Sequence, residues 1–346
     1  MNPFEAPVII DKSKDHLSGL TTIGGNRFYD NSMLDTMRVC PRRFYFRHIK
    51  HWELDGVRAA LIFGSSWHSG MDYLWQNPSC KIDEAFDAFM KIWNASDLRD
   101  ADVFDLYPRS PQRAKDMLIK YQERYGNWLA NNIELLSVEK PFIVPLSEDK
   151  QNLFYVGKLD KQYREYRFIY TCDHKTSSSF STTWLNSWSP NGQVDGYLFA
   201  GHMEYGSEFK GVVIDGALVQ KTSIDFKKIP VERQIDMLDN WKWEVLDLIE
   251  QIWYYETLLV QYRKAIEIGQ VHSPFLATYP KCTTSCTSYY GACPYLDLCK
   301  FIPNPEIYKD EEPPAGFIKS TWKPFEVDET PEGEFVVKIY EHINEA

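Results

Sequence analysis

The sequence of 346 residues contains no apolar run of about 18 residues, so we expect no membrane span and no membrane partner. Its first residues, Met-Asn-Pro-Phe-Glu-Ala-Pro, have neither the basic n-region nor the apolar h-region of a secretory signal. We therefore expect a cytoplasmic protein whose thiols stay reduced. A Gly-x-x-x-x-Gly-Lys-(Ser/Thr) motif is also absent, so the sequence predicts no ATP-driven motor of its own.

Positive charge is scarce as well. The formal net charge is −11, although residues 306–346 account for much of it, with 11 acidic and 4 basic side chains. An enzyme that acts on nucleic acid needs cations along the phosphate path. One basic segment, residues 38–50, interleaves five Lys or Arg side chains with Phe44, Tyr45 and Phe46. It is either a solvated helix face or a surface that tracks a nucleic-acid backbone and stacks bases.

Hydrophobic residues make up 44% of the chain and include 11 tryptophans, enough for a sizeable core. Hydrophobic periodicity predicts helices over residues 32–49, 61–75, 82–93, 111–129, 182–205 and 231–268, the first with Ser32 as its N-cap. Strands are predicted over residues 133–144, 153–163, 168–173 and 212–219. This order indicates an α/β fold with a mixed central sheet flanked by helices. We expect one domain over residues 1–302 and an acidic, proline-rich tail over 303–346, with a short strand at 335–340.

Two short motifs carry the chemistry. Two short strand-like runs each end on a carboxylate, in the motifs Gly157-Lys158-Leu159-Asp160 and Asp173-His174-Lys175-Thr176. The segment between these runs is polar and predicts a hairpin turn. Side chains alternate along a strand, so Asp173 and Lys175 share one face while His174 points away. Paired strands would bring Asp160 and Asp173 to one cation. Two carboxylates and a lysine suit metal-assisted phosphodiester hydrolysis, although Asp-x-Lys alone more often marks a solvated strand face.

Four of the seven cysteines lie in one short segment, at positions 282, 286, 293 and 299. Such crowding in an intracellular protein indicates metal binding. A zinc site is the simpler interpretation, because four thiolates can close a tetrahedral site, and an iron–sulfur cluster is the alternative. Cys80 and Cys172 stand apart, and Cys172 is expected to be a small buried hydrophobic residue.

Taken together, these motifs resemble the PD-(D/E)XK nuclease superfamily, and specifically its RecB-like branch with a C-terminal [4Fe–4S] cluster. That branch includes the AddB nuclease domain, CRISPR adaptation exonucleases and many phage proteins. The resemblance covers about residues 33–299 and follows the family order of motifs. The matching segments are Cys40-Pro41-Arg42-Arg43-Phe44-Tyr45, Gly64 to His68, Val138-Glu139, the two aspartate motifs, Gln193-Val194-Asp195-Gly196-Tyr197, and Cys293 to Cys299.

The resemblance implies a restriction-endonuclease-like core and assigns roles to its residues. Asp160, Asp173 and His68 would hold Mg²⁺ or Mn²⁺, with the His174 backbone carbonyl as a further ligand. Lys175 would position the attacking water, Gln193 and Tyr197 would lie beside the metal, and Glu139 would have a supporting role. Two of these assignments have a simpler alternative. His68 would be a core histidine whose hydrogen bonds are satisfied, and Gln193 and Tyr197 would be a hydrogen-bonded pair on the surface.

The same resemblance implies a [4Fe–4S] clasp that joins Cys40 to three C-terminal cysteines. The spacing departs from the family, which usually has two residues between the first two cysteines of that trio. We favour Cys286, Cys293 and Cys299, because Tyr289-Tyr290-Gly291 can form a tight turn, and keep Cys282 as the alternative.

The predicted function is therefore a metal-dependent exonuclease that acts on single-stranded DNA ends, in recombination, repair or DNA end processing. A helicase or recombinase is the expected partner unless the substrate is already single-stranded. Two alternatives stay open at this point. One is a non-catalytic, cluster-bearing scaffold or DNA-binding protein, and the other is a nuclease stabilised by zinc.

Overall fold

The computed structural model describes residues 22–23, 26–56, 59–99, 106–147, 152–268, 274–288, 291–308, 312–320, 325–329 and 335–339. The chain divides into two compact units. The first unit comprises Met1–Asp55, Ile143–Gly157 and Asp239–Tyr340, and the second comprises Gly56–Phe142, Lys158–Leu238 and Glu341–Ala346. Every predicted catalytic residue lies in the second unit, whereas Cys40 and the C-terminal cysteines lie in the first.

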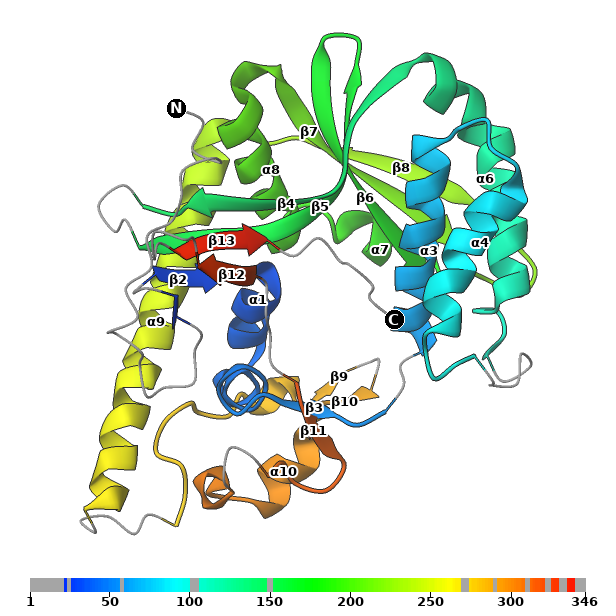
Figure 1. The fold of residues 1–346 in the computed structure, drawn as a ribbon. Helices are drawn as coiled ribbons and strands as arrows, with labels where there is room; N and C mark the ends of the chain where they lie inside the picture. Colours follow the sequence, from blue (N-terminus) through cyan, green and yellow to red (C-terminus); the bar gives the residue numbers. More distant parts are fainter. Residues whose placement is uncertain are drawn as a thin grey trace. The chain divides into compact units, whose positions relative to one another are not determined.

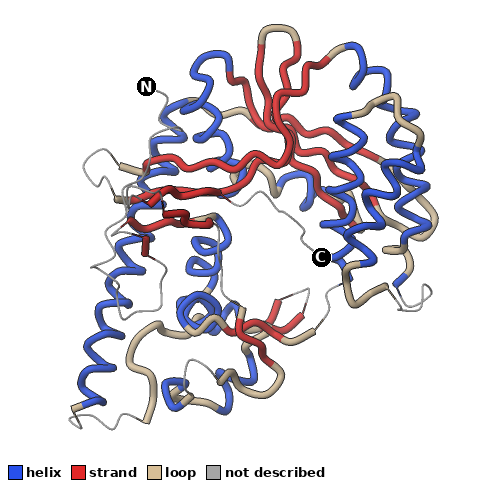
Figure 2. The backbone as a smooth tube through the Cα atoms, viewed as in Figure 1, coloured by secondary structure: helices blue, strands red, loops and turns tan. Residues whose placement is uncertain are grey.

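A mixed β-sheet forms the centre of the second unit (Figures 1 and 2). The seven-stranded sheet contains β4 (Ile133–Pro145), β5 (Leu153–Glu165), β6 (Phe168–Ser177), β7 (Phe209–Leu218) and β8 (Phe226–Val231), and also the short strands β1 (Thr22–Ile23) and β2 (Asn26–Tyr29). β5 pairs with β6 as an antiparallel hairpin, β6 with β7 in parallel, and β7 with β8 antiparallel, while β4 pairs with β5. The α/β fold with a mixed sheet and the hairpin between the two aspartate motifs are thus confirmed.

Three helices of the second unit lie side by side over one face of this sheet (Figure 1). They are α3 (Ala59–Gln76), α4 (Ile82–Asn94) and α6 (Pro111–Asn131). Their apolar stripes form one buried cluster with the sheet residues Cys172, Ala217 and Phe226. Burial of each large apolar side chain contributes about 1.5–3 kcal/mol, so this cluster fixes the helices against the strands. On α6, Leu118 and Tyr121 are buried in this cluster.

The predicted helix over residues 182–205 is in fact two helices, α7 (Thr182–Asn186) and α8 (Gly192–Tyr205), followed by a 3₁₀ turn at Gly206–Glu208. Pro190 lies between them, and a proline cannot donate the backbone hydrogen bond that a continuous helix needs at that position. Asn191 then caps α8, because its Oδ1 accepts from the N–H groups of Gln193 and Val194.

The first unit contains the small strands β1 (Thr22–Ile23), β2 (Asn26–Tyr29) and β3 (Trp52–Leu54) with the helices α1 (Asn31–Val39) and α2 (Pro41–Phe44) and a π-helix at Tyr45–Ile49. Most of the long helix α9 (Ile235–Glu267) belongs to it. The C-terminal part adds 3₁₀ turns at Thr283–Ser285 and Pro305–Ile307, α10 (Leu296–Phe301), β9 (Thr287–Ser288), β10 (Gly291–Ala292), β11 (Phe317–Lys319), β12 (Phe325–Glu329) and β13 (Phe335–Ile339). Within this unit the first part of β5 pairs with β2 in parallel.

The predicted helix over residues 32–49 is broken at Cys40, and its N-cap is Asp30 rather than Ser32. Asp30 Oδ1 accepts from the N–H of Met33 at 2.7 Å, which satisfies one of the free donors of the first turn. Cys40 is extended, with φ −169° and ψ 117°, because the residue before a proline is pushed out of the helical region. The chain therefore presents Cys40 at a bend between two helices.

The helix predicted from residue 231 begins at Ile235, because Phe226–Val231 forms the strand β8. The adjacent lysines Lys227 and Lys228, together with Pro230, obscured this strand in the sequence. β8 is the last strand in the sheet order, and an edge strand tolerates a proline that cannot donate to the ladder.

The predicted boundary at residue 303 stays a prediction. The described residues just beyond it are joined to the first unit, since Glu306 pairs with Arg263 at 2.7 Å and β11 pairs antiparallel with β3. The predicted terminal strand corresponds to β13, which pairs with β12, while Tyr340 lies outside the described residues. Among the described helices, none combines the length and the apolar character needed to cross a membrane.

Candidate active site

Asp160 and Asp173 lie on neighbouring strands of the β5–β6 hairpin. The last register pair toward this end is Lys161 with Cys172, so the two aspartates follow directly on either strand. Both are buried, with 7% and 1% of their surface exposed. The Asp160 carboxylate accepts a hydrogen bond of 2.8 Å from the backbone N–H of His174, which anchors it to β6. The hairpin thus brings the two predicted carboxylates together, as their spacing predicts.

His68 on α3 faces the Asp160 carboxylate. Its Nδ1 lies 3.3 Å from Asp160 Oδ2. Burial alone would lower the pKa of His68, but the charge and hydrogen bond of Asp160 outweigh it, and the pKa is raised. For Asp160, burial by itself would raise the pKa. The positive charges of His68 and Lys175 outweigh burial, so the pKa of Asp160 is well below its usual range. The aspartate therefore stays ionised and able to bind a cation.

Glu139 completes a group of three possible metal ligands. One ligand atom each of His68, Glu139 and Asp160 lies within 4.8 Å of the others. Glu139 occupies an unusual backbone position on β4, with φ 51°, and its carboxylate pairs with Lys158. A left-handed conformation inside a strand is costly for a residue with a side chain, and such strain is found most often at functional sites. Carboxylate oxygens and an imidazole suit a divalent cation such as Mg²⁺ or Mn²⁺.

Lys175 lies on the same strand face as Asp173, as alternation predicts. Its Nζ is 2.9 Å from Asp173 Oδ1 and 2.7 Å from Oδ2. Burial and the neighbouring charge of Asp160 raise the pKa of Asp173 against the opposing effect of Lys175. A bound cation would relieve the repulsion between the two carboxylates.

Gln193 and Tyr197 contact each other on α8, where Gln193 Nε2 donates to Tyr197 Oη at 2.9 Å. Tyr197 is 6% exposed, and its ring packs edge-on against Phe142 at 6.1 Å. The pair thus lies on the second helix after the Lys175 strand. Its predicted contact with the metals or the substrate stays a prediction.

The His174 side chain belongs to a different set of residues on the opposite face of β6. Its Nδ1 lies 3.4 Å from Asp215 Oδ2, and Asp215 in turn pairs with Lys228 at 2.8 Å. Burial lowers the pKa of His174 to about 3, so the ring is neutral. What His174 offers to the site is its backbone: the N–H holds Asp160, and the carbonyl stays a predicted metal ligand.

Sequence reasoning missed two buried ion pairs near the site. Lys161 Nζ lies 2.6 Å from Asp72 Oδ1, and Asp215 pairs with Lys228. The alternation of residues 212–219 could have identified Asp215 as an inward-pointing carboxylate. Asp72 carried a weaker signal, namely its position one helical turn after His68.

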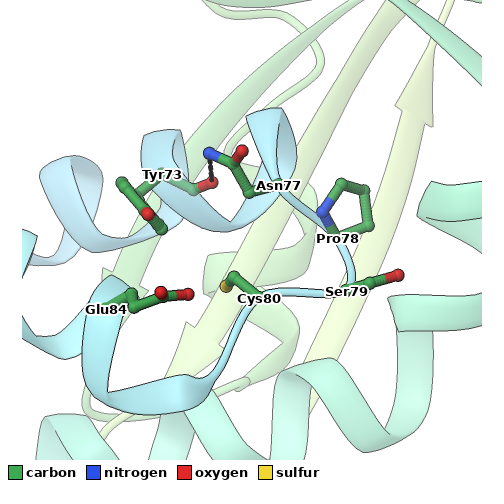
Figure 3. Close-up of a pocket in the computed structure, with 6 residues that line it drawn as sticks. All are labelled: Tyr73, Asn77, Pro78, Ser79, Cys80 and Glu84. Atoms are coloured by element: carbon green, nitrogen blue, oxygen red, sulfur yellow. Dashed lines mark hydrogen bonds between the residues drawn. The ribbon is translucent and has the colours of Figure 1, made fainter.

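A polar pocket of about 410 Å³ lies where α3 leads into α4 (Figure 3). It is lined by Tyr73, Asn77, Pro78, Ser79, Cys80 and Glu84. Asn77 Nδ2 donates to the Tyr73 carbonyl across one side at 3.1 Å. None of the predicted catalytic residues lines this pocket, so the chemistry is assigned to the carboxylates of the hairpin instead.

The predicted cluster cysteines all belong to the first unit. Burial raises the pKa of Cys293, and Cys40 and Cys286 are close enough to raise it further. Burial also raises the pKa of Cys299 to about 11, opposed by Lys281 and Arg42 and reinforced by Cys40 and Cys293. Among the described cysteines, no three sulfurs lie within 4.8 Å of one another.

Cys282, the alternative ligand, contacts Cys40. Its N–H donates to Cys40 Sγ at 3.3 Å, while its own Sγ contacts Thr284 Oγ1 at 3.2 Å. β9 and β10 pair as a hairpin between Cys286 and Cys293, and Tyr289 and Tyr290 of the predicted turn lie outside the described residues. The choice between Cys282 and Cys286 stays a prediction.

Comparison with known proteins gives a family match over most of the chain. Residues 31–300 match the model of the PD-(D/E)XK nuclease superfamily. A solved "putative exonuclease" from Eubacterium rectale is 16% identical, with a TM-score of 0.44 over 71% of this chain and 83% of that chain. The solved protein SSO0001 is 11% identical, with a TM-score of 0.29 over 64% of this chain and 76% of that chain. No curated protein matches the chain. The family match spans the hairpin carboxylates, Lys175 and the flanking helices, and the chain belongs to the PD-(D/E)XK nuclease superfamily.

Proposed function

We propose that this protein is a Mg²⁺- or Mn²⁺-dependent exonuclease that hydrolyses single-stranded DNA from its ends. The observation that carries the proposal is the convergence of His68, Glu139 and Asp160 within 4.8 Å, next to the Asp173–Lys175 pair. The donor set fits a hard divalent cation, because it offers two carboxylates and one imidazole. Asp160, Asp173, His68 and Glu139 would hold the cation.

Each residue has a defined task in phosphodiester hydrolysis. A divalent cation at this site would polarise the scissile phosphate and lower the pKa of a water molecule. Lys175 is held by both Asp173 oxygens and remains protonated, since the charges of Asp173 and Asp160 raise its pKa despite burial. It can therefore orient the attacking water and balance negative charge that develops on the phosphate. Gln193 and Tyr197 would hold the substrate backbone.

We further propose that Cys40, Cys286, Cys293 and Cys299 hold a structural [4Fe–4S] cluster. Four thiols fit such a cluster, and Cys40 contributes to the raised pKa of both Cys293 and Cys299. A tetrahedral zinc ion with Zn–S bonds of about 2.3 Å would draw its sulfurs to about 3.8 Å from one another. In a cluster several irons lie between the thiolates, so their sulfurs stay further apart than around a single zinc.

The proposed setting is recombination, repair or DNA end processing in bacterial or phage-infected cytoplasm, alongside a helicase or recombinase that supplies single strands. The test of the activity uses linear and circular single-stranded DNA of the same sequence. The wild-type protein should degrade the linear strand with Mg²⁺ or Mn²⁺, stop with a chelator and spare the circle. Cleavage of the circle at the same rate would indicate an endonuclease, and intact linear DNA would favour a non-catalytic scaffold.

A further inference from the structure

The segment that connects β6 to α8 carries three aromatic side chains, Phe180, Trp184 and Trp188. Phe180 and Trp184 have ring centroids 4.6 Å apart at an angle of 37°, and Trp184 and Trp188 are 5.3 Å apart at 80°. All three side chains are half-buried, whereas the large aromatics under α3, α4 and α6 are buried in the core. The rings begin five positions after Lys175 and end five positions before Gln193, so they lie between two predicted parts of the catalytic site.

The sheet register places these rings on the catalytic face. Lys175 on β6 pairs with Gly216 on β7, and Gly216 pairs with Lys227 on β8. Register partners in neighbouring strands project to the same face, so the three positions form one row. Asp173 and Lys175 define that face as the one that carries the candidate active site.

Gly216 makes room for the central ring. A Cβ atom at this position would lie 2.4 Å from Cη2 of Trp184 and 3.1 Å from Cε1 of Phe180. Both rings therefore cover the backbone directly beside Lys175. Lys227 extends the row, and its Nζ lies 5.5 Å from the centroid of the Phe180 ring. The result is a surface with two cations and exposed ring area next to the metal-binding carboxylates.

Local hydrogen bonds hold the aromatic segment in place at both ends. Ser181 Oγ accepts from the N–H of Trp184 at 3.2 Å and caps α7. Asn191 Nδ2 donates to the Ser187 carbonyl at 3.0 Å, and Gln220 Nε2 donates to the Ser178 carbonyl at 2.8 Å. A surface that is already ordered loses little conformational entropy when a ligand binds.

We infer that Phe180, Trp184 and Trp188 form a platform on which the bases of a single strand stack while its phosphates pass Lys175 and Lys227. This inference rests on the proposed function and names the residues that would bind its single-stranded substrate. Stacking uses the face that every base possesses, so the platform tolerates any sequence. A base inside a duplex has no free face to offer, and the platform therefore selects single strands. Simple packing of the rings against the sheet is the alternative, and it predicts no effect on DNA binding.

The test measures binding by fluorescence anisotropy in a chelator, so that no cleavage is needed. The probes are a fluorescein-labelled oligothymidine and a strand of equal length that lacks its bases. Trp184→Leu should weaken oligothymidine binding about tenfold, as expected for the loss of one base–aromatic stack. The abasic strand should bind both proteins equally, because it has phosphates but nothing to stack. Trp184→Phe should retain most of the affinity, and Trp243→Leu, at a residue 65% exposed in the first unit, is the matched control.

Equal oligothymidine affinity of the wild type and Trp184→Leu would overturn the inference. So would an equal loss for the abasic strand, which would indicate a general disturbance rather than lost stacking. A circular dichroism spectrum and a thermal midpoint for each variant confirm that the compared proteins are folded. These outcomes are separate from the proposed hydrolysis, whose failure would appear as absent metal-dependent cleavage by the wild type, whatever the result of the binding assay.

Discussion

Lys161 and Asp72 form a buried ion pair beside the candidate active site, with Nζ 2.6 Å from Oδ1 and no exposure of the lysine side chain. Lys161 follows Asp160 on β5, and Asp72 lies one helical turn after His68 on α3. Burial lowers the pKa of Lys161, but the charges of Asp72 and Asp160 outweigh it and the pKa is raised. The pair thus joins α3 to β5 next to the point where His68 meets Asp160.

Asp72→Ala should therefore destabilise the protein, because it leaves the Lys161 charge buried without its partner. Breaking a buried pair in this way costs about 3–5 kcal/mol, measured as the free energy of unfolding in urea. The double variant Asp72→Ala/Lys161→Met should recover much of the loss, since no charge remains buried. Asp83→Ala, which removes an exposed carboxylate on α4, is the control and should unfold like the wild type. If the double variant were as unstable as the single one, the charge would not be the cause.

Glu139→Gln should weaken Mn²⁺ binding about tenfold or more, the effect known even for residues that only support metal ligands. The reason is the loss of a carboxylate that lies within 4.8 Å of the ligand atoms of His68 and Asp160. Isothermal titration calorimetry with Mn²⁺ measures the change. Glu134→Gln provides a matched control on the same strand, where the side chain is 69% exposed and pairs with Arg164. Unchanged Mn²⁺ affinity of Glu139→Gln would restrict Glu139 to a role outside the metal site.

Cysteine substitutions should separate the two possible ligand sets. After anaerobic purification, Cys40→Ala and Cys286→Ala should lose iron and the visible absorbance of a cluster, while Cys282→Ala should keep most of both. Because Cys40 is 242 positions from Cys282, a shared cofactor closes a long loop, and its loss should lower stability by a few kcal/mol, by analogy with long disulfide loops. Cys80→Ala is the control. Zinc in place of iron in the wild type, or a higher iron content in Cys286→Ala than in Cys282→Ala, would reject this assignment.

Glu306 should make stability depend on pH in the acidic range. Burial raises its pKa, but Arg263, Lys50 and Tyr45 reverse this, and the pKa falls below the ordinary value of 4.5. A lowered pKa in the folded state adds stability that is present above the unfolded pKa and disappears as pH falls through the folded pKa. Glu306→Gln should thus cost about 2 kcal/mol at pH 7 in a urea titration, the scale of a hydrogen bond to a charged group. The difference from the wild type should shrink below pH 4.5, and a constant difference would exclude this linkage.

The sequence could predict the relations that depend on strand alternation and short spacing. Asp173 and Lys175 share a face because they are two residues apart on one strand, and Asp160 joins them because a hairpin is local. The proline after Cys40 and the Ser189-Pro190 step both marked helix ends, yet longer apolar periodicity obscured them. Local signals of this kind are visible in sequence when they are weighed above periodicity.

Other relations depend on the tertiary fold and leave no local signal. Asp72 and Lys161 are 89 positions apart and meet only when α3 packs on the sheet. The left-handed backbone of Glu139 and the hydrogen bond from the His174 N–H to Asp160 follow from how β4, β5 and β6 come together at the site. A sequence reveals which residues have suitable chemistry, whereas such distances are fixed by packing.

The most direct measurement of the central claim is the rate at which Lys175→Ala degrades end-labelled single strands with saturating Mg²⁺. The account predicts a loss of at least about a hundredfold, because the lysine acts on the water and on the developing charge of the phosphate. Binding of Mn²⁺ and of oligothymidine should change far less than the rate of cleavage. Lys227→Ala is a matched comparison, since it removes a lysine two strands away on the same face and should retain hydrolysis at saturating DNA. Degradation by Lys175→Ala at the wild-type rate would contradict the active-site assignment.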